Sequence, residues 1–221
     1  VVDHVKAIME MVENNSSGAS ETLEEARRLK SLAANLQEIN KVFRLGAEGE
    51  RAMAVHKRMP DKVMAAAREA GRLLEQAIRS GQITEQALFE RNYRPIPGTQ
   101  PQKFETSFDK LTDQIMPALQ EPLLEQDKDI ILACLVDEKG YLPTHNRRYT
   151  QPLTGDPAKD LVGNRTKRIF DDPVGRQCGA HQLPYLVQTY RRDTGEVLHD
   201  ISAPVYVNGR QWGGFRIGYR A

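Results

Sequence analysis

One motif in the chain brings two metal-binding side chains close together. Cys178 and His181 are three residues apart in Cys-Gly-Ala-His, and His145 and His199 lie elsewhere in the sequence. A thiolate and an imidazole at this spacing can both reach one metal ion or haem iron. Covalent haem attachment uses Cys-x-x-Cys-His, however, and the second cysteine is missing. Two interpretations stay open: a haem or metal site, or a turn in which Gly179 bends the chain, Cys178 packs and His181 forms a hydrogen bond.

A second group of reactive side chains is a run of cations between residues 147 and 176. Guanidinium groups bind carboxylates and phosphates through two parallel hydrogen bonds, so this run indicates a site for a small anion such as a carboxylate. Ion pairs with nearby aspartates are an equally open explanation. The cations are Arg147, Arg148, Arg165, Lys167, Arg168 and Arg176, and the aspartates are Asp156, Asp160, Asp171 and Asp172.

Two classes of function are disfavoured by the composition and by strand geometry. The chain has 31 Lys and Arg against 30 Asp and Glu, a net charge of +1, which argues against a nucleic-acid partner. His199 and Asp200 are neighbours in a predicted strand, so their side chains point to opposite faces and form no catalytic triad. Without a well-placed Ser or Cys nucleophile, we therefore expect no hydrolase activity of the acyl-transfer type.

The first 44 residues carry a seven-residue hydrophobic repeat. A strict repeat of this kind supercoils against partner helices, because one helix cannot bury such a stripe alone. The sequence predicts a coiled coil that forms a homodimer, with Leu23, Leu32 and Ile39 widening its apolar face. The alternative is an ordinary surface helix, although those average about 11–12 residues. The repeat positions are Val5, Ile8, Val12, Asn15, Ala19, Thr22, Ala26, Leu29, Ala33, Leu36, Asn40 and Phe43.

The rest of the chain divides into two parts. Residues 46–102 are expected to form a helical linker region: a helix over 50–80 with Pro60 near a helix start, a short helix after Thr84, and a rigid segment over 94–98. Residues 103–221 are expected to form a folded domain. It begins with an amphipathic helix over 103–128, which Pro117 and Pro122 interrupt.

Five strands are predicted after residue 129. A short first pair is followed by a loop and helix excursion over 145–184 and then by a three-strand meander. The overall class is α+β, with a long coiled-coil helix followed by helices and a five-stranded antiparallel sheet that has helices on one side. Gly213-Gly214 in the last strand permits a bulge or a close backbone approach, and alternation places Arg216 away from the core. The strands are 130–136, 141–144, 185–192, 196–207 and 211–219, with turns at Asp193-Thr-Gly195 and Asn208-Gly209.

Two stretches resemble parts of the methyl-accepting chemotaxis receptor family. The segment from Val12-Glu-Asn-Asn through Ala26-Arg-Arg-Leu29 to Val42-Phe-Arg-Leu45 is similar to the C-terminal end of the signalling coiled coil. The remainder resembles a sensor domain of the PAS/Cache type. Its motifs are Tyr93-Arg-Pro-Ile-Pro-Gly-Thr99, Gly140-Tyr-Leu-Pro-Thr-His-Asn146, Asn164-Arg-Thr-Lys-Arg-Ile-Phe170 and Trp212-Gly-Gly-Phe-Arg-Ile-Gly-Tyr219.

The resemblance implies signal transduction without chemistry of its own. Such receptors are dimers whose coil ends in a tip that holds the chemotaxis histidine kinase and its coupling protein, a region this sequence lacks. A sensor placed after the coil is expected in the cytoplasm, whether or not the parent receptor is membrane-anchored, and the two cysteines agree with a reducing compartment. Glu24-Glu25 is a pair of the kind that adaptation methylates, or an ordinary solvated pair.

The expected activity is binding of a small ligand whose effect is relayed to the coiled coil. A haem- or metal-based redox or gas sensor that uses Cys178 and His181 is one alternative, and a pure dimerisation module is another. The identity of the ligand cannot be inferred from the sequence. The residues expected to bind it are Tyr141, His145, Arg148, Arg165, Arg168, Gln188 and Tyr190.

Overall fold

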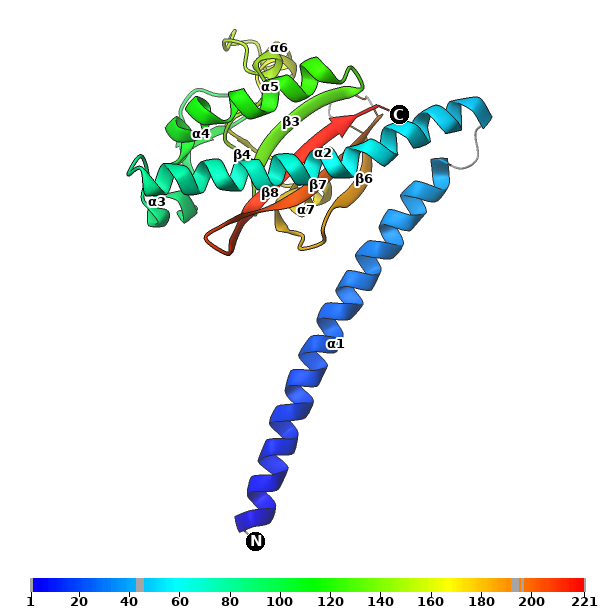
Figure 1. The fold of residues 1–221 in the computed structure, drawn as a ribbon. Coiled ribbons are helices and arrows are strands. Elements are labelled where there is room, and N and C mark those ends of the chain that lie inside the picture. The colour runs from blue at the N-terminus through cyan, green and yellow to red at the C-terminus, as the bar shows by residue number, and fades with distance from the viewer. Residues whose placement is uncertain (1, 43–45, 192–194, 196, 221) are drawn as a thin grey trace. The chain divides into compact units, whose positions relative to one another are not determined.

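The computed structural model describes residues 2–42, 46–191, 195 and 197–220, which form two compact units (Figure 1). The units are Val1–Lys41 and Val42–Ala221. The region 46–102, predicted as a separate linker, belongs to the second unit because its long helix packs on the sheet. Residues 43–45 of the coil motif, residues 193 and 194 of the first hairpin turn, and residue 196 of the following strand lie outside the described residues.

The first unit is a single helix, α1 (Val2–Val42), as the repeat predicted. Hydroxyls in its middle donate back to the preceding turn, for example Ser20 Oγ to the Ser16 carbonyl at 3.0 Å and Thr22 Oγ1 to the Gly18 carbonyl at 2.7 Å. Glu25 pairs with Arg28 across 3.5 Å, and both side chains are exposed. Pairing of α1 with a second copy stays a prediction. Its exposed large apolar side chains, 43–64% accessible, are Val5, Ile8, Met9, Met11, Val12, Leu23, Leu29, Leu32 and Leu36.

The second unit is built on an antiparallel sheet of four strands, so the prediction of five was wrong. The order is β3-β8-β7-β6. The predicted second strand, β4 (Tyr141–Leu142), pairs with β5 (Arg168–Ile169) instead. Asn146 explains this difference in part, because its Oδ1 accepts the Ala133 N–H at 2.8 Å on the free edge of β3. The four strands are β3 (Ile130–Asp137), β6 (Leu186–Arg191), β7 (Val197–Val207) and β8 (Arg210–Tyr219).

One face of this sheet carries the main hydrophobic core. Helix α2 (Gly46–Arg79) lies across β7 and β8, and its buried side chains recur every three or four residues. It runs through Pro60, which we expected near a start, because burial of Val55, Met59 and Val63 on the sheet stabilises both flanking turns. The helices α3 (Glu85–Phe89), α4 (Asp109–Ile115) and α5 (Pro117–Gln126) belong to the same unit.

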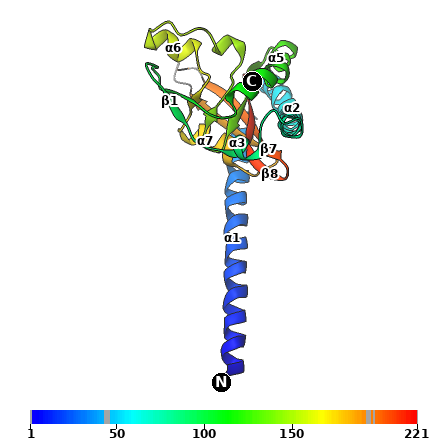
Figure 2. The same ribbon diagram turned by 90° about the vertical axis from the view of Figure 1, so that its left-hand side faces the viewer.

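The opposite face is also covered, whereas helices on one side only were expected. Figure 2 shows α2 and α5 to one side of the strands and α7 (Pro173–Ala180) and α6 (Pro157–Gly163) to the other. The short elements η1 (Arg147–Tyr149), β4 and β5 belong to the excursion between β3 and β6. Close approach at Gly213-Gly214 is confirmed, since a Cβ on Gly214 would lie 2.1 Å from the Cys178 carbonyl oxygen of α7.

The remaining local predictions hold in part. The Asn208-Gly209 turn is confirmed by φ values of +50° and +77°. The segment 94–98 is no rigid linker, because β1 (Arg94–Ile96) pairs with β2 (Lys103–Glu105). The helix expected from residue 103 begins only at α4, and Pro117 then starts α5. In the described part of the chain, no helix is both long and apolar enough to cross a membrane.

The contact between α2 and the sheet depends on Gly71, whose added Cβ would lie 2.4 Å from the Tyr206 carbonyl oxygen. We predict that Gly71→Ala lowers the free energy of unfolding by about 1–3 kcal/mol, because the helix must move off β7. Gly163→Ala is the matched control: its Cβ would meet Gln151 at an ordinary 3.7 Å. Urea denaturation measures both, and equal stability of the two variants would contradict the prediction.

Candidate functional site

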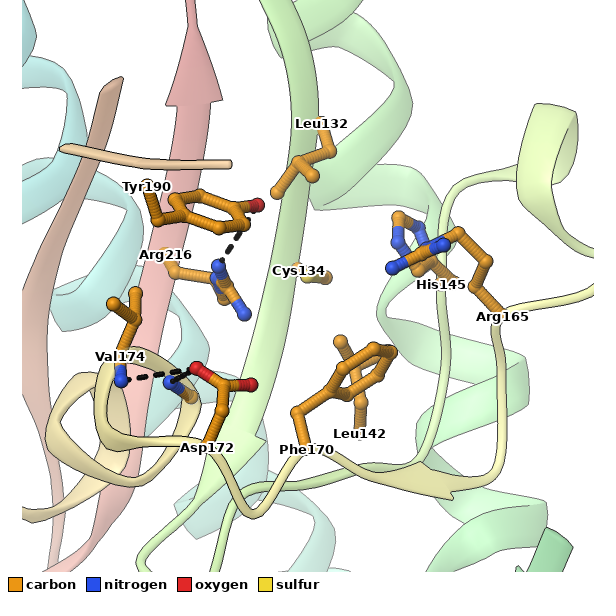
Figure 3. Close-up of a pocket in the computed structure, with 11 residues that line it drawn as sticks. Leu132, Cys134, Leu142, His145, Arg165, Phe170, Asp172, Val174, Tyr190 and Arg216 are labelled. Atoms are coloured by element: carbon orange, nitrogen blue, oxygen red, sulfur yellow. Dashed lines mark hydrogen bonds between the residues drawn. The ribbon is translucent and has the colours of Figure 1, made fainter. Parts of the chain in front are cut away.

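A small cavity lies on the side of the sheet that faces α7 (Figure 3). Its volume of about 20 Å³ accommodates one water-sized group. Strand β3 forms the back wall, and the excursion between β4 and α7 contributes most of the rest. The lining residues are Leu132, Cys134, Leu142, His145, Arg165, Phe170, Asp172, Val174, Gly175, Tyr190 and Arg216.

A buried ion pair stands at one side of the cavity. Arg216 donates from Nε and Nη2 to Oδ2 of Asp200, at 2.9 and 2.6 Å, and the two residues are 5% and 0% exposed. Strand alternation explains their position: Ser202 is the cross-strand partner of Arg216, and Asp200 is two residues away on the same face of β7. The second oxygen of Asp200 accepts from the Cys178 thiol at 3.1 Å. The carboxylate is therefore held on both oxygens.

Tyr190 extends this network to the edge of the sheet. Its hydroxyl oxygen accepts from Nη2 of Arg216 at 3.4 Å, and the guanidinium carbon lies 5.7 Å from the centre of its ring. Tyr190 belongs to β6, the outer strand of the sheet, and it is half-buried. Figure 3 shows Arg216 and Tyr190 together on one side of the cavity, with Asp172 and Val174 below them.

His145 and Arg165 stand on the other side of the cavity (Figure 3). Both are buried, at 4% and 6% exposure. Nδ1 of His145 accepts the Asn146 N–H at 2.8 Å, and the centre of the imidazole lies 4.7 Å from that of the Tyr149 ring, with the two planes tilted by 60°. The Arg165 guanidinium lies 5.3 Å from the centre of the Phe170 ring. Each side chain is thus oriented by its own local contacts.

Lys103 anchors the segment that carries Arg165. Its ammonium donates to the Asn164 side-chain oxygen at 2.6 Å and to the Thr166 carbonyl. Burial, followed by the positive charges of Arg168, Lys167 and Arg165, lowers the pKa of Lys103 to about 8, against an opposing effect of Asp160. Four cations thus lie near this segment, together with the carboxylate of Asp160.

The structure gathers three of the seven predicted ligand-binding residues around the cavity: His145, Arg165 and Tyr190. Arg168 lies at the periphery, with its guanidinium 4.9 Å from the Phe170 ring. Arg148 is exposed on η1. For Tyr141, the sequence of the two-residue strand β4 does not show which face of the strand the side chain takes.

Tyr141 and Gln188 point elsewhere. The Tyr141 hydroxyl donates to the Phe104 carbonyl at 3.0 Å and approaches Asp109, within the main core. Gln188 accepts from the Cys178 thiol at 3.6 Å and donates to Gln177 at 3.1 Å. Both are buried or half-buried in structural contacts rather than facing the cavity.

The ligand-binding prediction missed Arg216, Asp172 and Cys134. Alternation had already placed Arg216 on the face away from the core, and the structure confirms that orientation. Asp172, with Oδ1 accepting the N–H groups of Val174 and Gly175 at 3.0 and 3.1 Å, caps α7 at the cavity mouth. A helix-cap signal was present in Asp172-Pro173, but only the tertiary fold shows that this cap borders a cavity.

Several of the cations and aspartates in the excursion have structural roles. Lys167 forms an ion pair with Asp113 of α4 at 2.7 Å. Asp113 is not one of the four aspartates that the sequence suggested as partners. Asp156 caps α6, and Asp160 accepts from Thr154 in the preceding loop. Lys167 thus forms ion pairs, but with aspartates of α4 rather than with the predicted ones, and the anion site stays a prediction.

The residues present do not fit the haem or metal interpretation. Burial raises the pKa of the Cys178 thiol, and this thiol donates to Asp200, which disfavours the thiolate that a metal needs. The Nε2 of His181 is paired with Ser202 Oγ at 3.0 Å. His199 lies on the other face of the sheet, 4.8 Å from the ring of His56. Among the described residues, no group of three His, Cys, Asp or Glu could hold a metal ion.

The buried ion pair yields a first prediction for this site. Asp200→Ala leaves the Arg216 charge buried and unpaired, so we expect the free energy of unfolding to fall by about 3–5 kcal/mol. The double variant Asp200→Leu, Arg216→Met removes both charges and should recover part of that loss. Arg94→Ala, which breaks an exposed 3.4 Å pair with Glu105, should change stability by less than about 1 kcal/mol. Urea denaturation of all variants tests this, and a double variant as unstable as the single one would refute it.

Lys103 yields a prediction on pH. Its pKa in the folded state is about 8, below the unfolded value of 10.5, so the folded chain binds fewer protons between these pH values. Stability should rise with pH in that window, by roughly 1–3 kcal/mol from this group. Lys103→Met should lack this rise, whereas Lys139→Met, at an exposed position, should keep it. Denaturation curves at pH 7.5 to 10 measure the slope, and identical slopes for wild type and Lys103→Met would contradict the assignment.

Comparisons with protein families, with curated proteins and with solved structures find no match to this chain. What the site binds has therefore to be inferred from its own side chains. These are two buried guanidinium groups, an imidazole, a phenol, a carboxylate and a thiol around one small cavity, together with apolar side chains.

Proposed function

We propose that the second unit is a small-molecule sensor domain of a bacterial chemotaxis receptor, and that α1 is the end of its signalling coiled coil. The observation that carries the proposal is the cavity, whose lining combines the sheet (β3, β6, β8) with the excursion (residues 142–175). A ligand at this place contacts both parts at once. It can therefore change how the excursion packs on the sheet.

The order of elements supports a PAS/Cache-like sensor. The first strand of the sheet, β3, lies beside the last, β8, and the excursion between the short β4 and β6 covers the face that holds the cavity. The resemblance implied five strands with helices on one side, and of that arrangement the chain keeps the antiparallel meander and the position of β3 beside β8. Buried polar side chains, among them Asp200, Ser202 and Arg216, lie on the face under the excursion.

The ligand acts by shifting the populations of two states, which differ in how the excursion packs on the sheet. A cavity of about 20 Å³ is too small for most metabolites, so a ligand favours a state in which the excursion stands further from the sheet. Helix α2 packs on the opposite face of β7 and β8 and is the element that follows α1 in the chain. The ligand can shift the equilibrium only by its difference in affinity for the two states.

The exposed apolar side chains of α1 support a homodimer. Nine large apolar side chains of this helix are 43–64% accessible, and exposed apolar side chains in such number are typical of a surface that packs against a partner. In the proposed receptor the histidine kinase and coupling protein bind a region outside this sequence. A cytoplasmic location fits the two buried cysteines, which are both free.

The proposal predicts that the chain is a dimer through α1. Leu29→Glu with Leu36→Glu places charge in the apolar face and should give a monomer. Leu153→Glu, at a 46% exposed apolar position of the second unit, is the control and should stay dimeric. Light scattering coupled to size-exclusion chromatography at equal micromolar concentrations measures the mass. A monomeric wild-type chain would refute the receptor proposal.

The sensor proposal also predicts a stabilising ligand. A thermal-denaturation screen of organic acids, amino acids and neutral metabolites should find at least one compound that raises the melting temperature. Val174→Trp narrows the mouth of the cavity at a half-buried position and should abolish that increase. An empty screen, or a stabiliser that acts equally on Val174→Trp, would contradict a sensor site in this cavity.

A further inference from the structure

We propose that His56 and His199 form a proton-operated switch between helix α2 and the sheet, in which protonation of the pair loosens the first half of α2 from β7 and β8. The pair lies on the face of the sheet opposite the cavity. The switch therefore does not depend on what the cavity binds. Only its use as a second input to the receptor rests on the proposed function.

Three polar rings meet where α2 crosses the sheet (Figure 1). The centre of the His56 ring on α2 lies 4.8 Å from that of His199 on β7 and 5.3 Å from that of Tyr219 on β8. His199 and Tyr219 are direct partners in the antiparallel pair of β7 and β8, so both lie on the face that α2 covers. Both histidines are half-buried. A positive charge on one imidazole therefore repels a charge on the other at short range.

The hydrogen bonds around His56 accommodate the neutral imidazole. Its Nδ1 lies 2.6 Å from the Tyr219 hydroxyl oxygen, and its Nε2 is buried without a hydrogen-bond partner among the described residues. A protonated imidazole carries an N–H on both nitrogens, so the Nε2–H of the charged ring lacks an acceptor there. A buried donor that is left unpaired destabilises the packed state. Protonation thus favours a state in which Nε2 reaches water.

The groups that the strands direct toward this imidazole do not supply a negative charge within the described chain. On β8, burial raises the pKa of Tyr219, so its hydroxyl stays neutral when the imidazole gains a proton. β7 contributes His199 itself. Beside it on β6 is the Thr189 hydroxyl, 2.9 Å from Nδ1 of His199. Along the same edge lie Arg191, which is exposed, and Tyr185, which packs on the main core.

The carboxylates near the first half of α2 have other partners. Asp127 and Asp129 both pair with Arg58, two residues after His56. The side chain of Asp200 points to the opposite face of β7, where it forms the ion pair described above. A proton on His56 is therefore not compensated by these groups. The charged neighbours on α2 itself are exposed: Arg51, Lys57 and Asp61.

The protonation equilibrium of His56 sets the direction of the switch. Burial, followed by the charge of His199, lowers the pKa of His56 to about 4, against an ordinary value of 6.5. An imidazole released into water takes its ordinary pKa, so the open state binds more protons than the packed state between these two pH values. Opening therefore becomes more favourable as the pH falls through this window. From pH 7.5 to 5.5, the ratio of open to packed α2 should rise about tenfold.

The response is confined to the first half of α2. Around His56, the helix is held by the buried side chains of Val55 and Met59. Its second half is anchored separately, because Gly71 lets the backbone lie against β7 and Leu74 is fully buried. Segments of one helix can open separately when their contacts differ in this way. Since α2 follows α1 in the chain, the opening turns are those nearest to α1 in sequence.

The test is hydrogen–deuterium exchange of the whole chain at pH 7.5 and 5.5, with each rate corrected for the intrinsic effect of pH. Peptides that cover residues 50–62 should show the tenfold rise in opening, whereas peptides of β8 should not. His56→Gln removes the titrating ring and should abolish the rise. His4→Gln, at an exposed position on α1, is the matched control and should keep it. Circular dichroism confirms that each variant is folded.

Two further measurements keep the test decisive. Burial also lowers the pKa of His181 to about 4, on the other face of the sheet, so His181→Gln controls for acid effects at α7 and should keep the response of α2. Histidine ring NMR measures the pKa of His56 directly. If His56→Gln does not fold, His199→Gln should raise that pKa and weaken the response, because the second imidazole is gone.

The outcomes separate the switch from the sensor proposal. Opening of residues 50–62 that rises in acid, is lost in His56→Gln and persists in His4→Gln supports the switch. Equal opening at both pH values in the wild-type chain overturns it, as does a rise that His56→Gln retains or that His181→Gln abolishes. A His56 pKa near 6.5 in the folded chain also overturns it. None of these measurements uses a ligand, so a failed ligand screen leaves the switch standing, and a failed switch leaves the cavity proposal standing.

Discussion

The buried ion pair between Arg216 and Asp200 is the constraint on which the second face of the sheet depends. A guanidinium and a carboxylate removed from water are tolerated only when their remaining hydrogen bonds are made inside the protein. Here Cys178 of α7 and Tyr190 of β6 supply two such bonds. The pair therefore requires a cover over the sheet, and the excursion between β3 and β6 provides it.

The two faces of the same strands have different chemistry. On one face, β7 and β8 present apolar side chains to α2 and form a close-packed core. On the other face they present Asp200, Ser202 and Arg216, which lie next to a cavity or to α7. A core packed at crystal-like density transmits displacement, whereas a polar face with a cavity can accept a ligand. This asymmetry is what the proposed sensor function uses.

Local rules accounted for most of the elements. Alternation placed Arg216 away from the core, and the Asn-Gly pair predicted the turn at Asn208-Gly209, whose φ values are positive. The same rules failed at the edge of β3. There the Asn146 side chain accepts the Ala133 N–H in place of a neighbouring strand, and β4 pairs with β5 instead. They also failed for Tyr141, whose side chain enters the main core. A two-residue strand has too little pattern to show which face its side chains take.

The sequence by itself determined the long helix with its apolar repeat, the antiparallel meander, and a cationic excursion between strands, because each depends on periodicity or turn chemistry within a short stretch. Only the tertiary structure decided which cations meet. Arg165 and Arg216 are far apart in the chain, and the cover of the sheet brings them to one cavity, while Arg148 stays in solvent. Burial and proximity across the fold are set by packing, and no spacing of residues along the chain encodes them.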